Sequence, residues 1–155
     1  MDRLKTTSRI VHGLLIGFSP SNDGRANPIR MNEKTADHWP TELRLRKDKR
    51  LLTVTFDVGE TFDLPAEYLR VKSPSAEVQG HAPEERKTVP GKKDVMILEV
   101  LPIGNYAVRL VFDDMHSTGI YSWDYLHELG SNQHAYWREY LDELAVKNLS
   151  REPKR

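Results

Sequence analysis

The sequence predicts an α+β fold, with an antiparallel β-sheet built from hairpins, short helices and a C-terminal amphipathic helix. Short segments in which apolar and polar residues alternate fill the middle of the chain, and a segment with helical spacing ends it. No internal repeat interrupts this order. With 155 residues, the chain has the length of one domain and can bury roughly 70% of its unfolded surface.

Three consecutive segments in the first half of the domain alternate apolar with polar residues, as half-buried strands do. Charged or glycine-containing turns separate them. The strands are predicted over residues 42–46, 52–56 and 61–64, and the turns over residues 47–50 and 57–60.

A second hairpin is predicted further along the chain. Residues 95–101 are almost all apolar, which is typical of a strand covered on both faces. Residues 102–106 form a turn, and residues 106–112 alternate as the partner strand. The two hairpins therefore supply the sheet.

Helix signals follow each group of strands. Pro65 suits the first position of a short helix. Ser122 can cap a helix over residues 123–129, which Gly130 would end. Residues 133–149 place aromatic and aliphatic side chains at helical spacing, so a C-terminal amphipathic helix is expected there.

The chain divides into three parts. Residues 1–38 hold turn signals and no sustained period, so we expect a flexible N-terminal extension. Residues 39–149 form the folded domain, and residues 150–155 a tail that frays. No apolar run approaches the ~18 residues of a membrane span, and the short run near the start lacks a signal-peptide cleavage site. We therefore expect a cytoplasmic protein that does not bind membranes.

Composition excludes several classes of function. Lysine plus arginine equal aspartate plus glutamate at 23 each, which argues against nucleic acid as a partner because that binding needs a basic surface. The chain has no cysteine, so disulfides, thiolate metal sites and cysteine nucleophiles are excluded. The absence of cysteine also fits a reducing compartment.

The stretch most able to carry chemistry follows the last predicted strand. It contains Asp113, Asp114 and His116 in one polar turn. Imidazole and carboxylate groups suit zinc or iron, and His81 could supply a further ligand. The alternative is structural, with the aspartates bonding local amides and His116 capping the following backbone.

Aromatic residues follow this turn. Tyr121 and Trp123 could form a platform that binds a partner. The alternative is that both are core residues that dock the next helix.

Catalytic signatures are absent from the sequence. There is no P-loop, no dinucleotide-binding glycine motif and no nucleophile elbow. None of the histidines is followed two residues later by a carboxylate, as the iron triad of an oxygenase commonly requires. We therefore expect that the chain is not an enzyme.

Residues 64–81 and residues 112–126 together resemble the gamma-butyrobetaine hydroxylase-like N-terminal domain. The resemblance extends over roughly residues 40–130, and this chain looks like a bacterial, stand-alone form of the domain. In carnitine-synthesis oxygenases, the domain precedes a catalytic jelly roll and binds a structural zinc through three cysteines and one histidine. The catalytic jelly roll has no counterpart in this chain.

The resemblance also identifies the zinc positions. Ser73, Ser75 and Val78 stand where the three cysteines would be, and His116 stands at the histidine position. Hydroxyls are poor zinc ligands and valine is none. The resemblance therefore implies a lost zinc site, now held by hydrogen bonds and packing, and no cofactor is expected.

A related domain is appended to some iron–sulfur carrier ATPases of the Mrp type. The resemblance thus implies a non-catalytic interaction or accessory domain that serves iron–sulfur cluster assembly or metalloprotein maturation. Its partner would be a protein, such as an Mrp-type carrier. The alternative is a zinc- or iron-binding protein that uses His116 with the carboxylates of the same loop.

Overall fold

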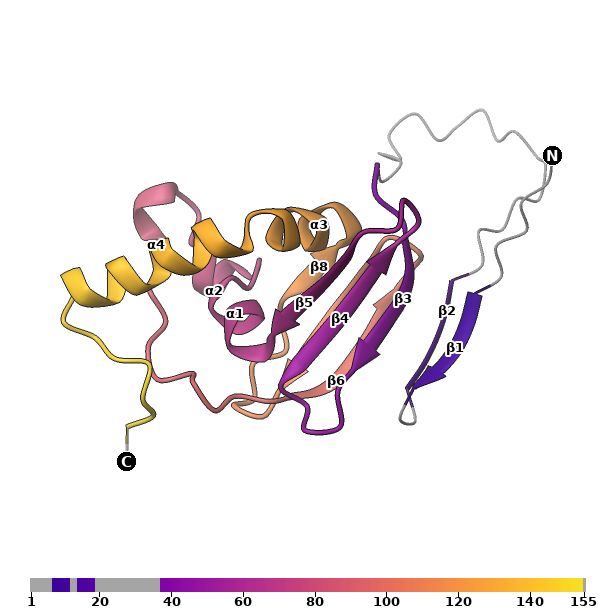
Figure 1. Ribbon diagram of the computed structural model, residues 1–155. Helices are drawn as coiled ribbons and strands as arrows, with labels where there is room; N and C mark the ends of the chain where they lie inside the picture. Colours follow the sequence, from indigo (N-terminus) through magenta and orange to yellow (C-terminus); the bar gives the residue numbers. More distant parts are fainter. Residues whose placement is uncertain (1–6, 12–13, 19–36, 155) are drawn as a thin grey trace.

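Two three-stranded antiparallel sheets form the centre of the fold (Figure 1). The computed structural model describes residues 7–11, 14–18 and 37–154. The first sheet has the order β3-β4-β5, with strands Pro40–Leu45, Leu51–Phe56 and Thr61–Pro65. The second has the order β6-β7-β8, with strands Ile97–Ile103, Ala107–Phe112 and Ile120–Ser122.

The inner faces of both sheets contribute to one hydrophobic core. Side chains on a strand point alternately to opposite faces, so every second residue is buried. On β4 the buried residues are Leu52, Val54 and Phe56, and on β7 they include Leu110 and Phe112. The alternation seen in the sequence therefore identifies the buried face of these strands correctly.

Strand β6 differs from its sequence prediction. It was expected to be covered on both faces, but Leu98 and Leu101 are 41% and 39% exposed. A register irregularity between Ile97 and Glu99 interrupts its pairing with β7. Only the face that carries Ile97 and Val100 is buried in the core. An apolar run alone does not reveal whether a second layer covers a strand.

Helices gather at one end of the sheets (Figure 1). The helices are α1 Ala66–Val71, α2 Ala76–Gln79, the 3-10 helix Pro83–Glu85, α3 Trp123–Ser131 and α4 Gln133–Val146. The predicted positions of α1, α3 and α4 agree with the structure to within a few residues, and the α+β fold class is confirmed. Over the described ranges, no helix has the length and apolar character that crossing a membrane requires.

Helix α3 confirms one predicted end and corrects the other. Ser122 caps its start, because the Ser122 hydroxyl accepts a hydrogen bond from the Tyr125 amide at 3.1 Å. Gly130 does not end the helix, which continues to Ser131. A Cβ atom at Gly130 would lie 2.7 Å from Cδ1 of Phe62 and closer still to two other ring atoms. Gly130 therefore allows the helix to approach β5 closely.

The C-terminal tail, expected to fray, is anchored to the domain. The amides of Gly91 and Lys93 donate to the carbonyls of Ser150 and Arg151 at 2.9 and 3.1 Å. The Arg151 guanidinium also donates to both carboxylate oxygens of Glu67, at 2.8 and 2.7 Å. Glu67 is buried, and a buried carboxylate requires such a counter-charge.

The first 38 residues contain two described strands. Strands β1 Thr7–Val11 and β2 Leu14–Phe18 pair as an antiparallel hairpin. At the other end of this segment, the His38 amide donates to Asp124 at 3.2 Å. Residues 1–6, 12–13 and 19–36 lie outside the described residues, and the expected flexibility of residues 1–38 stays a prediction.

Candidate functional site

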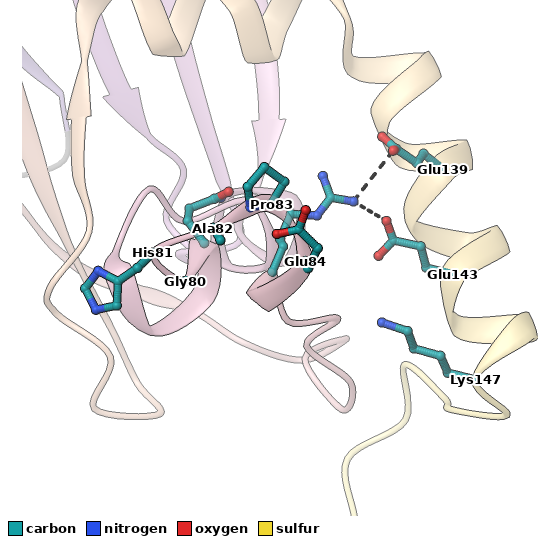
Figure 2. Close-up of a pocket in the computed structure, with 10 residues that line it drawn as sticks. Gly80, His81, Ala82, Pro83, Glu84, Glu139, Glu143 and Lys147 are labelled. Carbon is teal, nitrogen blue, oxygen red and sulfur yellow. Dashed lines mark hydrogen bonds and ion pairs between the residues drawn. The ribbon is translucent and has the colours of Figure 1, made fainter.

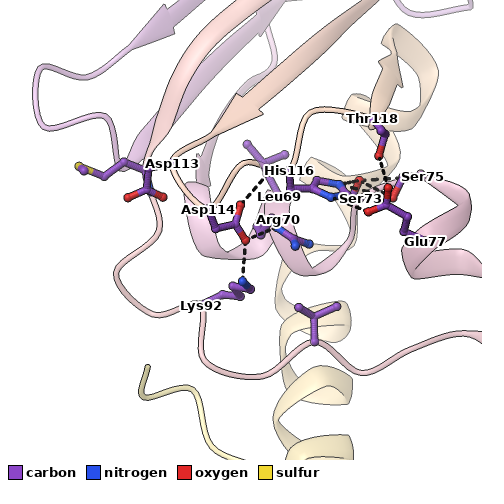
Figure 3. Close-up of polar contacts among 12 residues, drawn as sticks. Leu69, Arg70, Ser73, Ser75, Glu77, Lys92, Asp113, Asp114, His116 and Thr118 are labelled. Carbon is purple, nitrogen blue, oxygen red and sulfur yellow. Dashed lines mark hydrogen bonds and ion pairs between the residues drawn. The ribbon is translucent and has the colours of Figure 1, made fainter. Parts of the chain in front are cut away.

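The candidate site is a buried corner where two distant loops meet (Figure 3). His116 lies between β7 and β8, whereas Ser73 and Ser75 lie between α1 and α2. Glu77 follows in α2. Figure 3 shows the His116 ring directed at these three side chains. The fold thus brings together the histidine and two of the three positions that the resemblance identifies.

Three polar atoms form a close triangle in this corner. Nε2 of His116 lies 2.9 Å from Oγ of Ser73 and 3.4 Å from Oγ of Ser75. The two hydroxyl oxygens are 3.3 Å apart. The three residues are 6%, 0% and 5% exposed, so these groups replace solvent for one another.

The second ring nitrogen of His116 faces a carboxylate. Nδ1 lies 3.3 Å from Oε2 of Glu77, a side chain that is 65% exposed. Burial lowers the pKa of His116 and the Arg70 charge lowers it further, while Glu77 opposes both effects. A neutral ring with its proton on Nδ1 matches these contacts, since Nδ1 donates to Glu77 and the unprotonated Nε2 can accept from a serine hydroxyl.

Asp114 is held by two cations and does not face the His116 ring. Its Oδ2 accepts from Arg70 Nε at 2.8 Å and from Lys92 Nζ at 2.6 Å. Its Oδ1 accepts from the backbone amide of His116 at 3.2 Å. Burial raises the pKa of Asp114, but the hydrogen bond from Lys92 and the Arg70 charge outweigh burial and lower the pKa. The carboxylate therefore stabilises the turn.

Asp113 and His81 are placed away from this corner. The Asp113 carboxylate accepts from the Met96 amide at 2.9 Å, which ties the turn to the start of β6. His81 is exposed and its backbone amide donates to Glu85 at 2.8 Å. Across the part of the chain that the structure describes, no three histidine or acidic side chains are placed to hold a metal ion.

The corner does not have the donor set of the zinc site that the resemblance implies. Ser73 and Ser75 offer hydroxyls, and Val78, which is buried, offers no donor. Zinc sites in proteins use thiolate, imidazole and carboxylate ligands. One imidazole with two hydroxyls and a valine does not fit.

Tyr121 and Trp123 are core residues, which corrects the prediction that they bind a partner. Both are fully buried at 0% exposure. The Tyr121 hydroxyl donates to the Leu69 carbonyl at 2.5 Å, and the Trp123 indole to the Asn105 carbonyl at 2.8 Å. Both rings pack in the core, and the polar group of each ring has a hydrogen-bond acceptor within the protein.

A shallow cavity of about 810 Å³ lies between α4 and the loop that contains the 3-10 helix (Figure 2). Arg86 forms ion pairs across it with Glu143 and, at 3.6 Å, with Glu139. Thr88 also donates to Glu143 at 2.9 Å. Figure 2 shows His81 directed away from these groups. This network joins the loop to α4.

Sequence reasoning did not single out Glu77, Arg70 or Lys92. Glu77 carried one local signal, because an acidic residue in the first turn of a helix is favoured. Nothing in the sequence revealed that it faces His116. Arg70 and Lys92 become recognisable only when the fold places both on Asp114.

The sequence model of the family described as "Gamma-butyrobetaine hydroxylase-like, N-terminal" matches residues 43–127. The chain belongs to this family. The matched range includes Ser73, Ser75, Val78 and His116. The resemblance predicted from the sequence is therefore confirmed.

Solved structures agree with membership of the gamma-butyrobetaine hydroxylase-like N-terminal family. One NMR solution structure is 44% identical, with 76% of this chain and 93% of the other covered and a TM-score of 0.66. A second NMR structure is 46% identical, with coverages of 81% and 93% and a TM-score of 0.67. A crystal structure from Acidithiobacillus ferrooxidans, a protein of unknown function in the DUF971 family, is 40% identical, with coverages of 59% and 91% and a TM-score of 0.50. No curated protein matches the chain.

Proposed function

We propose that the chain is a non-catalytic accessory domain that acts by binding a protein partner in iron–sulfur cluster assembly or metalloprotein maturation. The observation that carries this proposal is that the polar groups in the turn after β7 are engaged by other groups of the same chain. Both ring nitrogens of His116 face groups of the same chain, and Asp114 is held between two cations. Groups committed in this way hold two loops together and are poorly placed to act on a substrate.

The alternative of a metal-binding protein receives no support from side-chain positions. Such a site would need the His116 ring to converge with Asp113, Asp114 or His81. The Asp114 carboxylate contacts His116 only at its backbone amide, and the Asp113 carboxylate accepts a hydrogen bond from the Met96 amide. His81 is exposed beside the 3-10 helix. We therefore prefer the accessory function.

The proposed partner is an iron–sulfur carrier ATPase of the Mrp type. What supports it is the similarity of this domain to the one appended to some of these carriers. This domain would then bind in trans the kind of protein to which its relatives are fused. Fold similarity alone does not establish function, so the pairing needs a direct binding measurement.

Isothermal titration of the purified chain into the Mrp-type carrier of the same organism tests this proposal. We expect saturable binding, with the cluster absorbance remaining on the carrier. The chain alone should acquire no cluster when it is incubated with ferrous iron, sulfide and reductant. A chain that assembled its own cluster, or that failed to bind the carrier in both its apo and cluster-loaded forms, would contradict the proposal.

A further inference from the structure

The outer face of the second sheet carries a row of three residues across all three strands. Leu101 on β6 pairs with Arg109 on β7, and Arg109 pairs with Ile120 on β8. Directly paired residues share one face of a sheet. Leu101 and Ile120 are 39% and 41% exposed, whereas Val108 and Leu110, which flank Arg109 in sequence, are fully buried on the other face. We call this row the β6–β8 face.

The corresponding row on the first sheet has a different character. Arg44 pairs with Thr53, and Thr53 pairs with Asp63. The hydroxyl of Thr53 donates to the Asp63 carboxylate at 2.6 Å. That row is polar and bonded internally, as a solvated sheet face is expected to be. The exposed aliphatic side chains of the β6–β8 face are therefore specific to the second sheet.

Arg109, at the centre of the β6–β8 face, has an unmet hydrogen-bonding requirement. Its Nε atom is buried and has no hydrogen-bond partner among the residues that the structure describes. Leaving a buried donor without an acceptor is energetically unfavourable. The Arg109 side chain as a whole is half-buried, and none of the described residues supplies the missing acceptor.

We propose that the β6–β8 face is the docking surface for the protein partner, and that the partner presents a carboxylate flanked by apolar side chains. This inference rests on the proposed function. A carboxylate complements the charge of Arg109 and can accept from a guanidinium in a bidentate manner. Apolar side chains beside it would cover Leu101 and Ile120. Arginine within an apolar surround is a frequent centre of binding energy at interfaces.

Site-specific photo-crosslinking in cells that naturally produce the protein tests the surface without assuming the partner. A benzophenone amino acid replaces Leu101 in one variant and Thr53, on the outer face of the first sheet, in the matched control. Mass spectrometry then identifies the crosslinked segment. We expect an adduct from position 101 and none from position 53, with an aspartate or glutamate between apolar residues in the captured segment.

A charge swap tests the chemistry of the contact. Arg109→Glu should weaken binding of the identified partner by roughly tenfold or more, as the loss of a close interfacial charge pair does. Reversing the partner's carboxylate to arginine should restore binding to Arg109→Glu. Arg109→Lys, which keeps the charge, should bind with intermediate affinity. Thermal unfolding of each variant separates loss of binding from loss of the fold.

The possible outcomes distinguish the docking surface, the nature of the partner and the proposed function from one another. An adduct from position 53 but none from 101 would overturn the docking surface and leave the proposed function standing. An adduct from 101 that Arg109→Glu leaves unchanged would overturn the acidic partner, and an adduct with a second copy of the chain would overturn the hetero-partner. Absence of adducts at both positions, together with no binding to the Mrp-type carrier, would overturn the proposed function itself.

Discussion

The Nε2 atom of His116 lies 2.9 Å from the hydroxyl oxygen of Ser73, which joins the loop after β7 to the loop after α1. Both residues are buried, and the contact brings together segments far apart in the sequence. In the zinc site that the sequence resemblance implies, a metal ion would connect these positions. Here a hydrogen bond makes the connection, and Ser75 at 3.4 Å from the same nitrogen extends it.

Replacement of His116 by alanine should lower the free energy of unfolding by about 2–4 kcal/mol. The change removes a buried ring and with it the Nε2 acceptor that faces the buried Ser73 and Ser75 hydroxyls. Urea denaturation measures the difference. His81→Ala is the matched control, because His81 is exposed, and its cost should stay within about 0.5 kcal/mol. Equal losses in the two variants would contradict a structural role for His116.

Stability should fall as the pH drops below the ordinary histidine pKa of 6.5, because burial lowers the pKa of His116 in the folded state. Between the two pKa values, the unfolded chain binds a proton that the folded chain does not. The stabilisation is therefore fully present above pH 6.5 and is lost as the pH falls through the lower, folded-state pKa. The pKa of Asp114 is lowered from 3.8, so its protonation changes the stability only at more acidic pH.

Chemical denaturation at several pH values between 5 and 8, for the wild type and His116→Gln, measures this effect. Glutamine keeps hydrogen-bonding capacity but does not titrate. The wild type should lose more stability than the variant as the pH decreases across this range. Parallel pH profiles would show that another group is responsible.

Cysteine at positions 73, 75 and 78 should create a zinc site with His116. The polar atoms at Ser73, Ser75 and His116 already lie within 3.4 Å of one another, and three thiolates with one imidazole form a common structural zinc site. Elemental analysis of the Ser73→Cys, Ser75→Cys, Val78→Cys variant should find stoichiometric zinc. Adding His116→Ala should weaken zinc binding. A folded triple variant that remained free of zinc would refute the assignment of these positions.

Gly130→Ala should destabilise the domain by about 1–3 kcal/mol, because the new methyl group overlaps the ring of Phe62. Thermal unfolding measures the loss. Ser131→Ala, at the adjacent exposed position, is the control. Combining Gly130→Ala with Phe62→Leu should cost less than the sum of the single changes, since the smaller side chain leaves room. Strict additivity would contradict a steric cause.

Periodicity was sufficient for the strands with one buried face, such as β4, and for the long helix α4. It missed β8, because three residues are too few to show a period. It also misjudged β6, where an apolar run indicates burial but the exposed Leu98 and Leu101 show an uncovered face. Local sequence patterns show which residues of a segment are apolar. Whether those residues are covered depends on elements that are distant in the sequence.

The candidate site was only partly predictable for the same reason. Resemblance to the family identified His116, Ser73 and Ser75, which the fold brings together. Tyr121 and Trp123 gave a signal that core and surface aromatic residues share, and only their 0% exposure decides between the two. The unsatisfied Nε of Arg109 could not be inferred, because it depends on what its neighbours bury.

The central claim is that the corner around His116 holds no metal ion. The most direct test is the metal content of untagged protein purified from its natural source, measured beside that of His116→Ala. We predict substoichiometric zinc and iron in both proteins, because the hydroxyls and the valine at positions 73, 75 and 78 offer none of the thiolate ligands of a structural zinc site. Near-stoichiometric zinc or iron in the wild type that disappears in His116→Ala would contradict this account. It would show that His116 holds a metal, and the metal-binding alternative would replace the accessory function proposed here.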